Sequence, residues 1–273
     1  MNPSLIVLTD FFDLSNRALT YAAGLAMPLE AHLVLLHLRQ DGPLSPEEFR
    51  SRHSRRAERQ TTHELQQLAA TQPVPTEVAI SDEFLPDAVQ EMVQRHHHLL
   101  LVLGRPTPAT LPQEIVTSTA MDLLRQAPYP LLIVPANGAD TLPPRRMLLA
   151  VDGEPFHLFE HQDVMRQLLH ATQGTLDVVH VTDDEHMRPD TATIRRTIQD
   201  TNLLPALPET KVHEVYQPSL VGGILQEANR QKADLLVAIA RSHSLMGGLF
   251  HQSITAQLIE ESPIPLLILP AKD

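Results

Sequence analysis

Cysteine is absent from the 273-residue chain, basic residues are few, and no long apolar run occurs. Without cysteine the chain can form no disulfide, no thiolate nucleophile and no cysteine-ligated zinc or iron–sulfur site. The 21 Lys and Arg residues face 33 Asp and Glu residues, which gives a net charge of −12. Because nonspecific nucleic-acid binding needs a cationic surface, we expect no nucleic-acid partner.

The apolar runs, such as Leu99–Leu103, are about five to seven residues long and fall far below the roughly 20 that span a bilayer. The N-terminus MNPSLIVLTD lacks the basic region and apolar core of a signal peptide. We therefore expect a cytoplasmic protein with no membrane partner. The apolar fraction of 42% is sufficient to build a folded core.

The most informative feature present is an internal repeat. APYPLLIVPA at 127–136 nearly matches SPIPLLILPA at 262–271, which begins 135 residues later. Two homologous units follow from this repeat. We predict domain 1 at 1–136, a Pro- and Gly-rich linker at 137–145 and domain 2 at 146–273.

Three further segments repeat in the same order. SLIVLTD (4–10) parallels RMLLAVD (146–152), and HLLLVLG (98–104) parallels DLLVAIA (234–240). The third pair is AHLVLLHLRQD and GTLDVVHVTDD, each with a histidine, His37 or His180, after its apolar run. We interpret these histidines as partly buried and hydrogen-bonded; the alternative is that they line a binding crevice.

Short apolar runs alternate with longer segments of 3.6-residue periodicity, which predicts strands alternating with helices. The expected strands are 4–10, 32–38, 75–81, 99–104, 131–135, 146–152, 174–182, 211–217, 234–240 and 265–269. The expected helices are 14–27, 46–71, 84–97, 114–126, 157–172, 189–201, 219–231 and 250–261. The pattern predicts an α/β fold: two tandem, doubly wound domains, each with a five-stranded parallel sheet.

These ordered motifs resemble the universal stress protein family in its tandem two-domain form. The resemblance rests on Thr9-Asp10-Phe11 after strand one, on Leu33–Leu38, on Gly104 and on TSTAMDLLRQAPYPLLIVP at 117–135. It implies a UspA-like, adenine nucleotide alpha hydrolase-like fold. In this family the final strands pair between domains, so we expect 131–135 and 265–269 to form an internal pseudo-dimer, with a homodimer as a further expectation.

Members that bind ATP carry a Gly-x2-Gly-x9-Gly-Ser/Thr loop after strand four, whose backbone N–H groups hold the phosphates. The positions that match in domain 1 are Gly104, Thr107 and Thr117-Ser118, so two of the three glycines are replaced by threonine. Prolines in the same loop remove further backbone donors. ATP is therefore the candidate cofactor at domain 1, and none is assigned with certainty.

The other residues of this candidate nucleotide site in domain 1, as the resemblance implies, are Thr9, Asp10 and Leu38. In domain 2 the matching positions are Ile239, Ser242 and Ser253, and Asp152 matches Asp10. We interpret these residues of domain 2 as a degenerate site. The alternative role for the two aspartates is to cap the loop or helix that follows strand one.

Two histidine motifs could also carry chemistry. HLFEH at 157–161 places His157, Glu160 and His161 at the spacing of a helical metal site, as in a metal-dependent hydrolase. We prefer an ordinary solvent-facing first helix for this segment. The run His96–His98 ends a predicted helix, where histidine suits the helix dipole; adventitious metal binding is its alternative reading.

No nucleophile–base pair or carboxylate pair emerges, so we assign no catalytic residue and no metal site. The first hypothesis is a stress-response small-ligand sensor or protein-interaction module without robust catalysis. The alternative is an ATP-binding protein with slow ATPase activity at domain 1.

Overall fold

The computed structural model describes residues 3–9, 13–38, 55–105, 113–138, 141–158, 163–184, 191–200, 210–241 and 253–272. The strands are β1 Ser4–Thr9, β2 His32–Leu38, β3 Thr76–Ser81, β4 His98–Arg105, β5 Leu131–Pro135, β6 Arg146–Val151, β7 His157–Leu158, β8 Thr175–Thr182, β9 Val212–Tyr216, β10 Leu235–Arg241 and β11 Leu266–Lys272. The helices are α1 Asp13–Ala26, α3 Arg55–Ala70, α4 Leu85–Arg95, α5 Gln113–Gln126, α6 Asp163–Thr172, α7 Thr191–Asp200, α8 Leu220–Arg230 and α10 Ile254–Glu261.

The predicted α/β fold with its doubly wound parallel sheets is confirmed. The strand order is β3-β2-β1-β4-β5 in the N-terminal half and β9-β8-β6-β10-β11 in the C-terminal half. All neighbours within each half of this order are parallel. In both halves the order reverses beside the first strand, β1 or β6, which is where ligands bind in folds of this kind.

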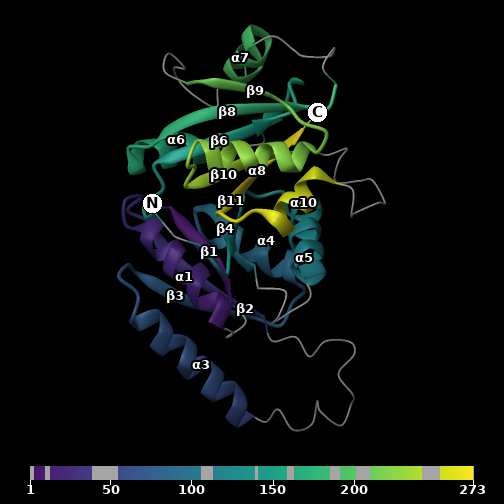
Figure 1. Ribbon diagram of the computed structural model, residues 1–273. Coiled ribbons are helices and arrows are strands. Elements are labelled where there is room, and N and C mark those ends of the chain that lie inside the picture. Colours follow the sequence, from purple (N-terminus) through teal and green to yellow (C-terminus); the bar gives the residue numbers. More distant parts are fainter. Residues whose placement is uncertain are drawn as a thin grey trace.

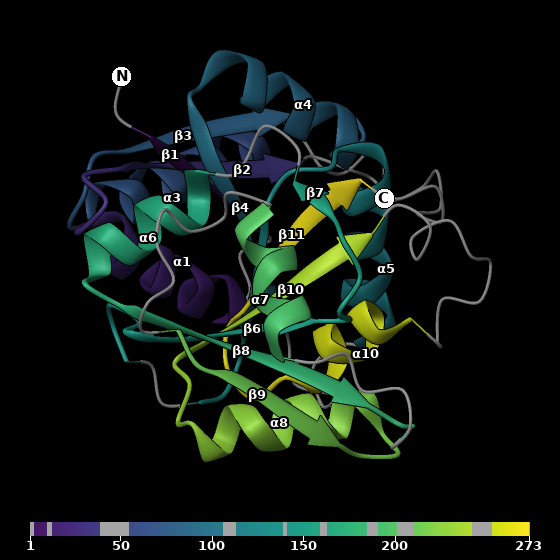
Figure 2. The same cartoon turned by 90° about the horizontal axis from the view of Figure 1, so that it is seen from above.

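Two apolar layers cover the faces of the sheet. Successive strand residues point to opposite faces, so Leu5 and Val7 join one buried cluster while Ile6 and Leu8 join the other. The first cluster includes α1, α6 and α7, and the second includes α4, α5, α8 and α10. Figure 2 shows α1 and α6 on one side of the strands and α5 and α10 on the other.

The two halves share one sheet of eleven strands because β5 and β11 pair antiparallel. In this pairing Leu132 lies opposite Leu267. In Figure 1 the yellow β11 runs between the purple-to-teal N-terminal half and the green C-terminal half. Helices α5 and α10 also pack against each other across the same boundary.

One buried arginine bridges this boundary. Arg105, the last residue of β4, donates from its two terminal guanidinium nitrogens to the carbonyl oxygens of Ile259 and Ser262, each at 2.6 Å. These carbonyls lie at the C-terminal end of α10, where a cation suits the helix dipole. Burial lowers the pKa of Arg105, and the carboxylate of Glu260 partly opposes this effect.

Strand register establishes which residues of the two halves correspond. Gly104 pairs with Val134 in one half, and Ile239 pairs with Leu269 in the other. The offset of 135 residues therefore extends through the fourth strand of each half. The alignment of HLLLVLG with DLLVAIA in the sequence analysis was one residue out of register.

The segment 157–172 differs from the single helix predicted for it. Residues His157–Leu158 form β7, which pairs antiparallel with Ala271 and Lys272 at the end of β11, and α6 begins only at Asp163. Leu158 is buried in this position. The tertiary pairing with β11 thus outweighs the local helical pattern.

Candidate functional site

The C-terminal ends of the central strands of each half form the candidate site. In the N-terminal half, three of the predicted residues lie there on adjacent strands: Thr9 ends β1, Leu38 ends β2, and Gly104 is next to last in β4. The parallel pairing of β1 with both β2 and β4 brings these ends to the same edge of the sheet. The predicted Asp10 and Thr107 lie outside the described residues.

Two of the predicted site residues in the N-terminal half have buried hydroxyl groups. Thr9 and Thr117 are 8% and 6% exposed, and neither side-chain oxygen has a hydrogen-bond partner among the described residues. Thr117 lies in the second turn of α5, the helix that follows β4. A buried hydroxyl without a partner costs free energy, so each of these two groups calls for a hydrogen-bond partner beyond the described residues.

His37 lies next to this edge. Its Nδ1 is 3.1 Å from the carbonyl oxygen of Thr9, the residue with which it is paired in the sheet. A protonated Nδ1 donates this hydrogen bond. Ser118, the next residue after Thr117, is an exposed residue of α5.

The C-terminal half has an ion pair at the equivalent edge. Asp152, which follows β6, accepts two hydrogen bonds from Arg241, from Nε at 2.6 Å and from a terminal nitrogen at 2.7 Å. Arg241 also donates to the carbonyl oxygens of Glu154 and Pro155. Its guanidinium carbon lies 5.8 Å from the ring centre of Phe156.

This arginine ties the loop after β6 to the end of β10. The side chain of Arg241 is 6% exposed, whereas that of Asp152 is 52% exposed. Asp152 also accepts from the backbone N–H of Glu154 at 3.1 Å, which agrees with the predicted loop-capping role. Arg241 was not among the residues predicted from the sequence. The available signal was an arginine at the end of the apolar run 234–240, because that run corresponds to the strand beside strand one, which Asp152 follows.

The 135-residue offset identifies the counterparts of these residues in the N-terminal half. The counterpart of Arg241 is Pro106, and a proline side chain forms no ion pair. The counterpart of Ser118 is Ser253, which precedes α10 and has extended backbone angles. The hydroxyl of Ser253 is buried and has no partner among the described residues. Ser242 lies outside them.

His180 occupies the position of His37 in the C-terminal half. Burial lowers the pKa of His180, while a hydrogen bond with the backbone of Asp152 and the carboxylates of Glu214 and Asp152 oppose that shift. His180 is 5% exposed. This agrees with the interpretation of a buried, hydrogen-bonded histidine.

Both readings of 157–161, the preferred solvent-facing helix and the alternative helical metal site, are wrong in placing His157 on a helix. His157 lies in β7, so it cannot share a helical face with His161 through i,i+4 spacing. Glu160 and His161 lie outside the described residues. A cavity of about 480 Å³ does occur, but at the opposite end of the N-terminal half, lined by residues that include Ala26, His32 and Val74.

The family model described as "Universal stress protein family" matches residues 1–135 and again residues 144–270. The chain belongs to the universal stress protein family. The double match confirms the tandem repeat. No curated protein matches the sequence.

Solved structures support the fold. A universal stress protein from Archaeoglobus fulgidus DSM 4304 is 14% identical, with a TM-score of 0.64 over 100% of this chain and 97% of its own. A protein of unknown function from Pseudomonas aeruginosa PAO1 is 18% identical, with a TM-score of 0.55 over 98% and 92%. The cytoplasmic domain of a prokaryotic cation chloride cotransporter is 10% identical, with a TM-score of 0.52 over 98% and 95%.

Among the described residues of this universal stress protein, no helix combines the length and hydropathy needed to cross a bilayer.

Proposed function

We propose that this universal stress protein is a small-ligand sensor in the stress response, with its ligand site at the strand-end edge of domain 1. The proposed domains are 1–136 and 146–273, joined by the linker 137–145. The observation that carries the proposal is the contrast between the two edges. Both domains have buried hydroxyls without partners among the described residues, at Thr9 and Thr117 in domain 1 and at Ser253 in domain 2, but only domain 2 has an arginine, Arg241, that pairs with the aspartate after the first strand.

The physical reasoning concerns how each edge meets its hydrogen-bonding needs. In domain 2 Arg241 donates to Asp152 and to two backbone carbonyls, so the chain itself supplies a cation at this edge. In domain 1 no arginine occupies the equivalent position, since Pro106 stands there. A ligand with polar groups can therefore supply at domain 1 the kind of polar contacts that Arg241 supplies in domain 2.

The second candidate is an ATP-binding protein with slow ATPase activity at domain 1. The hydroxyl groups of Thr117 and Ser118, at the position of the family's phosphate-binding Gly-Ser/Thr, favour it. Hydroxyl donors can replace part of the backbone cradle that the missing glycines would have provided. The negative net charge and the proline-rich loop favour weak phosphate binding, so sensing without turnover remains the first proposal.

We also propose a cytoplasmic location and a pseudo-dimeric organisation within one chain. The antiparallel pairing of β5 with β11 supports the latter, because it covers two apolar strands that would otherwise be open sheet edges. Light scattering after size-exclusion chromatography distinguishes a single chain of 30.4 kDa from a further homodimer.

Calorimetric titration with ATP, ADP and AMP, each with Mg²⁺, tests the ligand site. We expect one binding event per chain that Thr117→Val weakens by about tenfold or more, because one hydrogen bond to a charged phosphate contributes roughly 1.5–3 kcal/mol. Ser118→Ala is the second test variant. Ser253→Ala, its counterpart in domain 2, is the matched control and should leave the affinity unchanged.

Two results would contradict parts of this proposal. Equal weakening by Ser118→Ala and Ser253→Ala would show that the site is not confined to domain 1. Absence of binding by all three nucleotides would reject the ATP candidate and leave sensing of another ligand, to be sought with a panel of anionic metabolites. Phosphate release that persists in Thr117→Val would exclude this residue from an ATPase site.

A further inference from the structure

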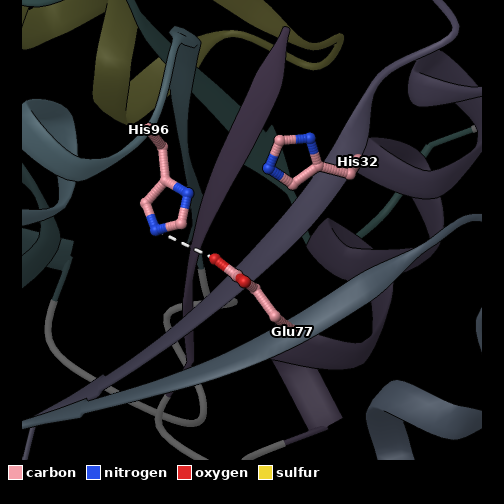
Figure 3. A group of neighbouring side chains, drawn as sticks. All are labelled: His32, Glu77 and His96. Carbon is pink, nitrogen blue, oxygen red and sulfur yellow. Dashed lines mark ion pairs between the residues drawn. The ribbon is translucent and has the colours of Figure 1, made fainter. Parts of the chain in front are cut away.

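Three metal-ligating side chains converge at the N-terminal ends of β2 and β3, in the first half of the chain. His32 is the first residue of β2, Glu77 is the second of β3, and His96 directly follows α4. Figure 3 shows the two imidazole rings and the carboxylate directed toward a common space. The sequence analysis assigned no metal site, because these residues are distant in sequence.

Regular backbone structure explains the convergence. His32 and Val34 lie on the same face of β2, because strand side chains alternate. Val34 is paired with Glu77 in the parallel register of β2 and β3, which places Glu77 on that face as well. Val34 belongs to the apolar cluster that packs under α4. His96 directly follows α4 over this face, and its backbone N–H donates to the carbonyl oxygen of Met92 in the last turn of the helix.

The spacing of the ligand atoms is close to that of a metal site. One ligand atom from each residue lies within 4.8 Å of the other two. His96 Nε2 is 2.9 Å from Glu77 Oε1, and the ring centres of His32 and His96 are 5.9 Å apart. Ligands of a tetrahedral zinc ion, at 2.0–2.2 Å from the metal, stand about 3.3–3.6 Å apart. Small side-chain rotations therefore bring all three atoms to coordination distance.

We propose that His32, Glu77 and His96 bind one divalent transition-metal ion, of which Zn²⁺ is the best match. Two imidazole nitrogens and one carboxylate oxygen form a ligand set typical of zinc sites. Nitrogen ligands disfavour Mg²⁺ and Ca²⁺, which prefer oxygen. The carboxylate also supplies a negative charge, and among the described residues its ion-pair partner is His96 itself.

The site is open on one side. The side chain of Glu77 is 51% exposed and that of His96 is 18% exposed. A tetrahedral ion held by three protein ligands keeps its fourth position for water or an exchangeable ligand. The site lies at the N-terminal ends of the strands, whereas the proposed ligand edge lies at their C-terminal ends. Metal binding can therefore be tested independently of the proposed function.

The test is titration of chelator-treated full-length protein with ZnCl₂, with CoCl₂ as a spectroscopic probe. We expect one Zn²⁺ per chain, and for Co²⁺ the intense visible absorption of a four-coordinate site. His32→Ala and His96→Ala should each weaken Zn²⁺ binding by about 100-fold or more, since loss of outer-shell partners alone costs about 10–100-fold. Glu77→Gln should also weaken it and should change the Co²⁺ spectrum.

His97→Ala is the matched control, because His97 is the exposed neighbour of His96 and is not part of the triad. It should bind Zn²⁺ like the wild type. Circular dichroism of each metal-free variant confirms folding before titration. Equal losses in His97→Ala and His96→Ala, retention of one Zn²⁺ by His32→Ala, or failure of the wild type to bind Zn²⁺ would each overturn the site.

Discussion

Replacing Arg105 by methionine should weaken the attachment between the two halves of the protein. The arginine ends β4 in the first half and hydrogen-bonds to the carbonyls of Ile259 and Ser262, which belong to the second. Methionine retains the apolar stem of the side chain but removes the charge and both donors. The change therefore isolates the polar contacts across the boundary from the packing around them.

The two hydrogen bonds set the expected magnitude. A hydrogen bond from a charged donor contributes about 1.5–3 kcal/mol, and a cation at a helix C-terminus adds roughly 0.3–1 kcal/mol. The pKa of Arg105 is lowered by its burial, and the desolvation behind this shift offsets part of the gain. We expect Arg105→Met to lower the free energy of unfolding by about 3 kcal/mol. At about 2 °C per kcal/mol for a chain of this size, the Tm should fall by roughly 6 °C.

Urea denaturation and hydrogen exchange together form the assay. Exchange of the amides in the last turn of α10 should accelerate in Arg105→Met. The amides of β2, which lies away from the boundary in the strand order, should change little. Arg105→Lys should have an intermediate effect, because lysine keeps the charge but cannot donate through the planar fork. Arg95→Gln is the control, since Arg95 forms an exposed pair with Glu91 and such pairs contribute about 0–1 kcal/mol.

A loss in Arg105→Met no larger than that in Arg95→Gln would refute the reasoning. A large loss of stability with unchanged amide exchange in α10 would also refute the reasoning, because the substitution would then destabilise the first half rather than its contact with α10. Agreement of both measurements with expectation would show that the bonds to Ile259 and Ser262 couple the two halves.

Two further predictions concern the edge of domain 2. In a double-mutant cycle with Asp152→Asn and Arg241→Gln, urea denaturation should give a coupling energy of about 1–2 kcal/mol. This energy is lower than that of a fully buried pair because Asp152 is half-exposed. Additive effects of the two substitutions would contradict the ion pair. Burial lowers the pKa of His180 from 6.5, so the folded state favours the neutral imidazole. The stability that the neutral imidazole contributes is therefore complete above pH 6.5 and is lost as the pH falls below that value. His180→Asn should therefore lose less stability than the wild type between pH 7.5 and 5.5, whereas His97→Asn should follow the wild type; parallel pH profiles for His180→Asn and the wild type would contradict the prediction.

Most of the fold could be predicted from the sequence because its signals are local and repeated. Buried parallel strands appear as short apolar runs, and the predicted strand 32–38 has the same bounds as β2. The failure at 157–172 has a physical reason. The pairing of His157 and Leu158 with the end of β11 depends on residues more than 100 positions away, and periodicity within one segment carries no information about such a partner.

The candidate site was less predictable for the same reason. The strand-one aspartate at Asp152 could be found from the repeat, but its partner Arg241 is the last residue of a different strand, β10. Likewise, the sequence indicates His96 only as part of a histidine run. Its contact with Glu77 depends on the pairing of β2 with β3 and on the position of α4. Local patterns identify the elements, whereas the site depends on how elements meet.

The different hydrogen-bond partners of Arg105 and Arg241 show how the two halves of a duplicated chain can take different roles. By strand register the two arginines occupy neighbouring positions, since Arg241 corresponds to Pro106 and Arg105 to Ala240. One binds the helix end of the other half, and the other binds an aspartate in its own half. Two identical subunits would have the same residue at each of these positions, so their two edges could not differ in this way. Covalent fusion removes that constraint, so one edge can hold its own ion pair while the other serves as the ligand site that we propose.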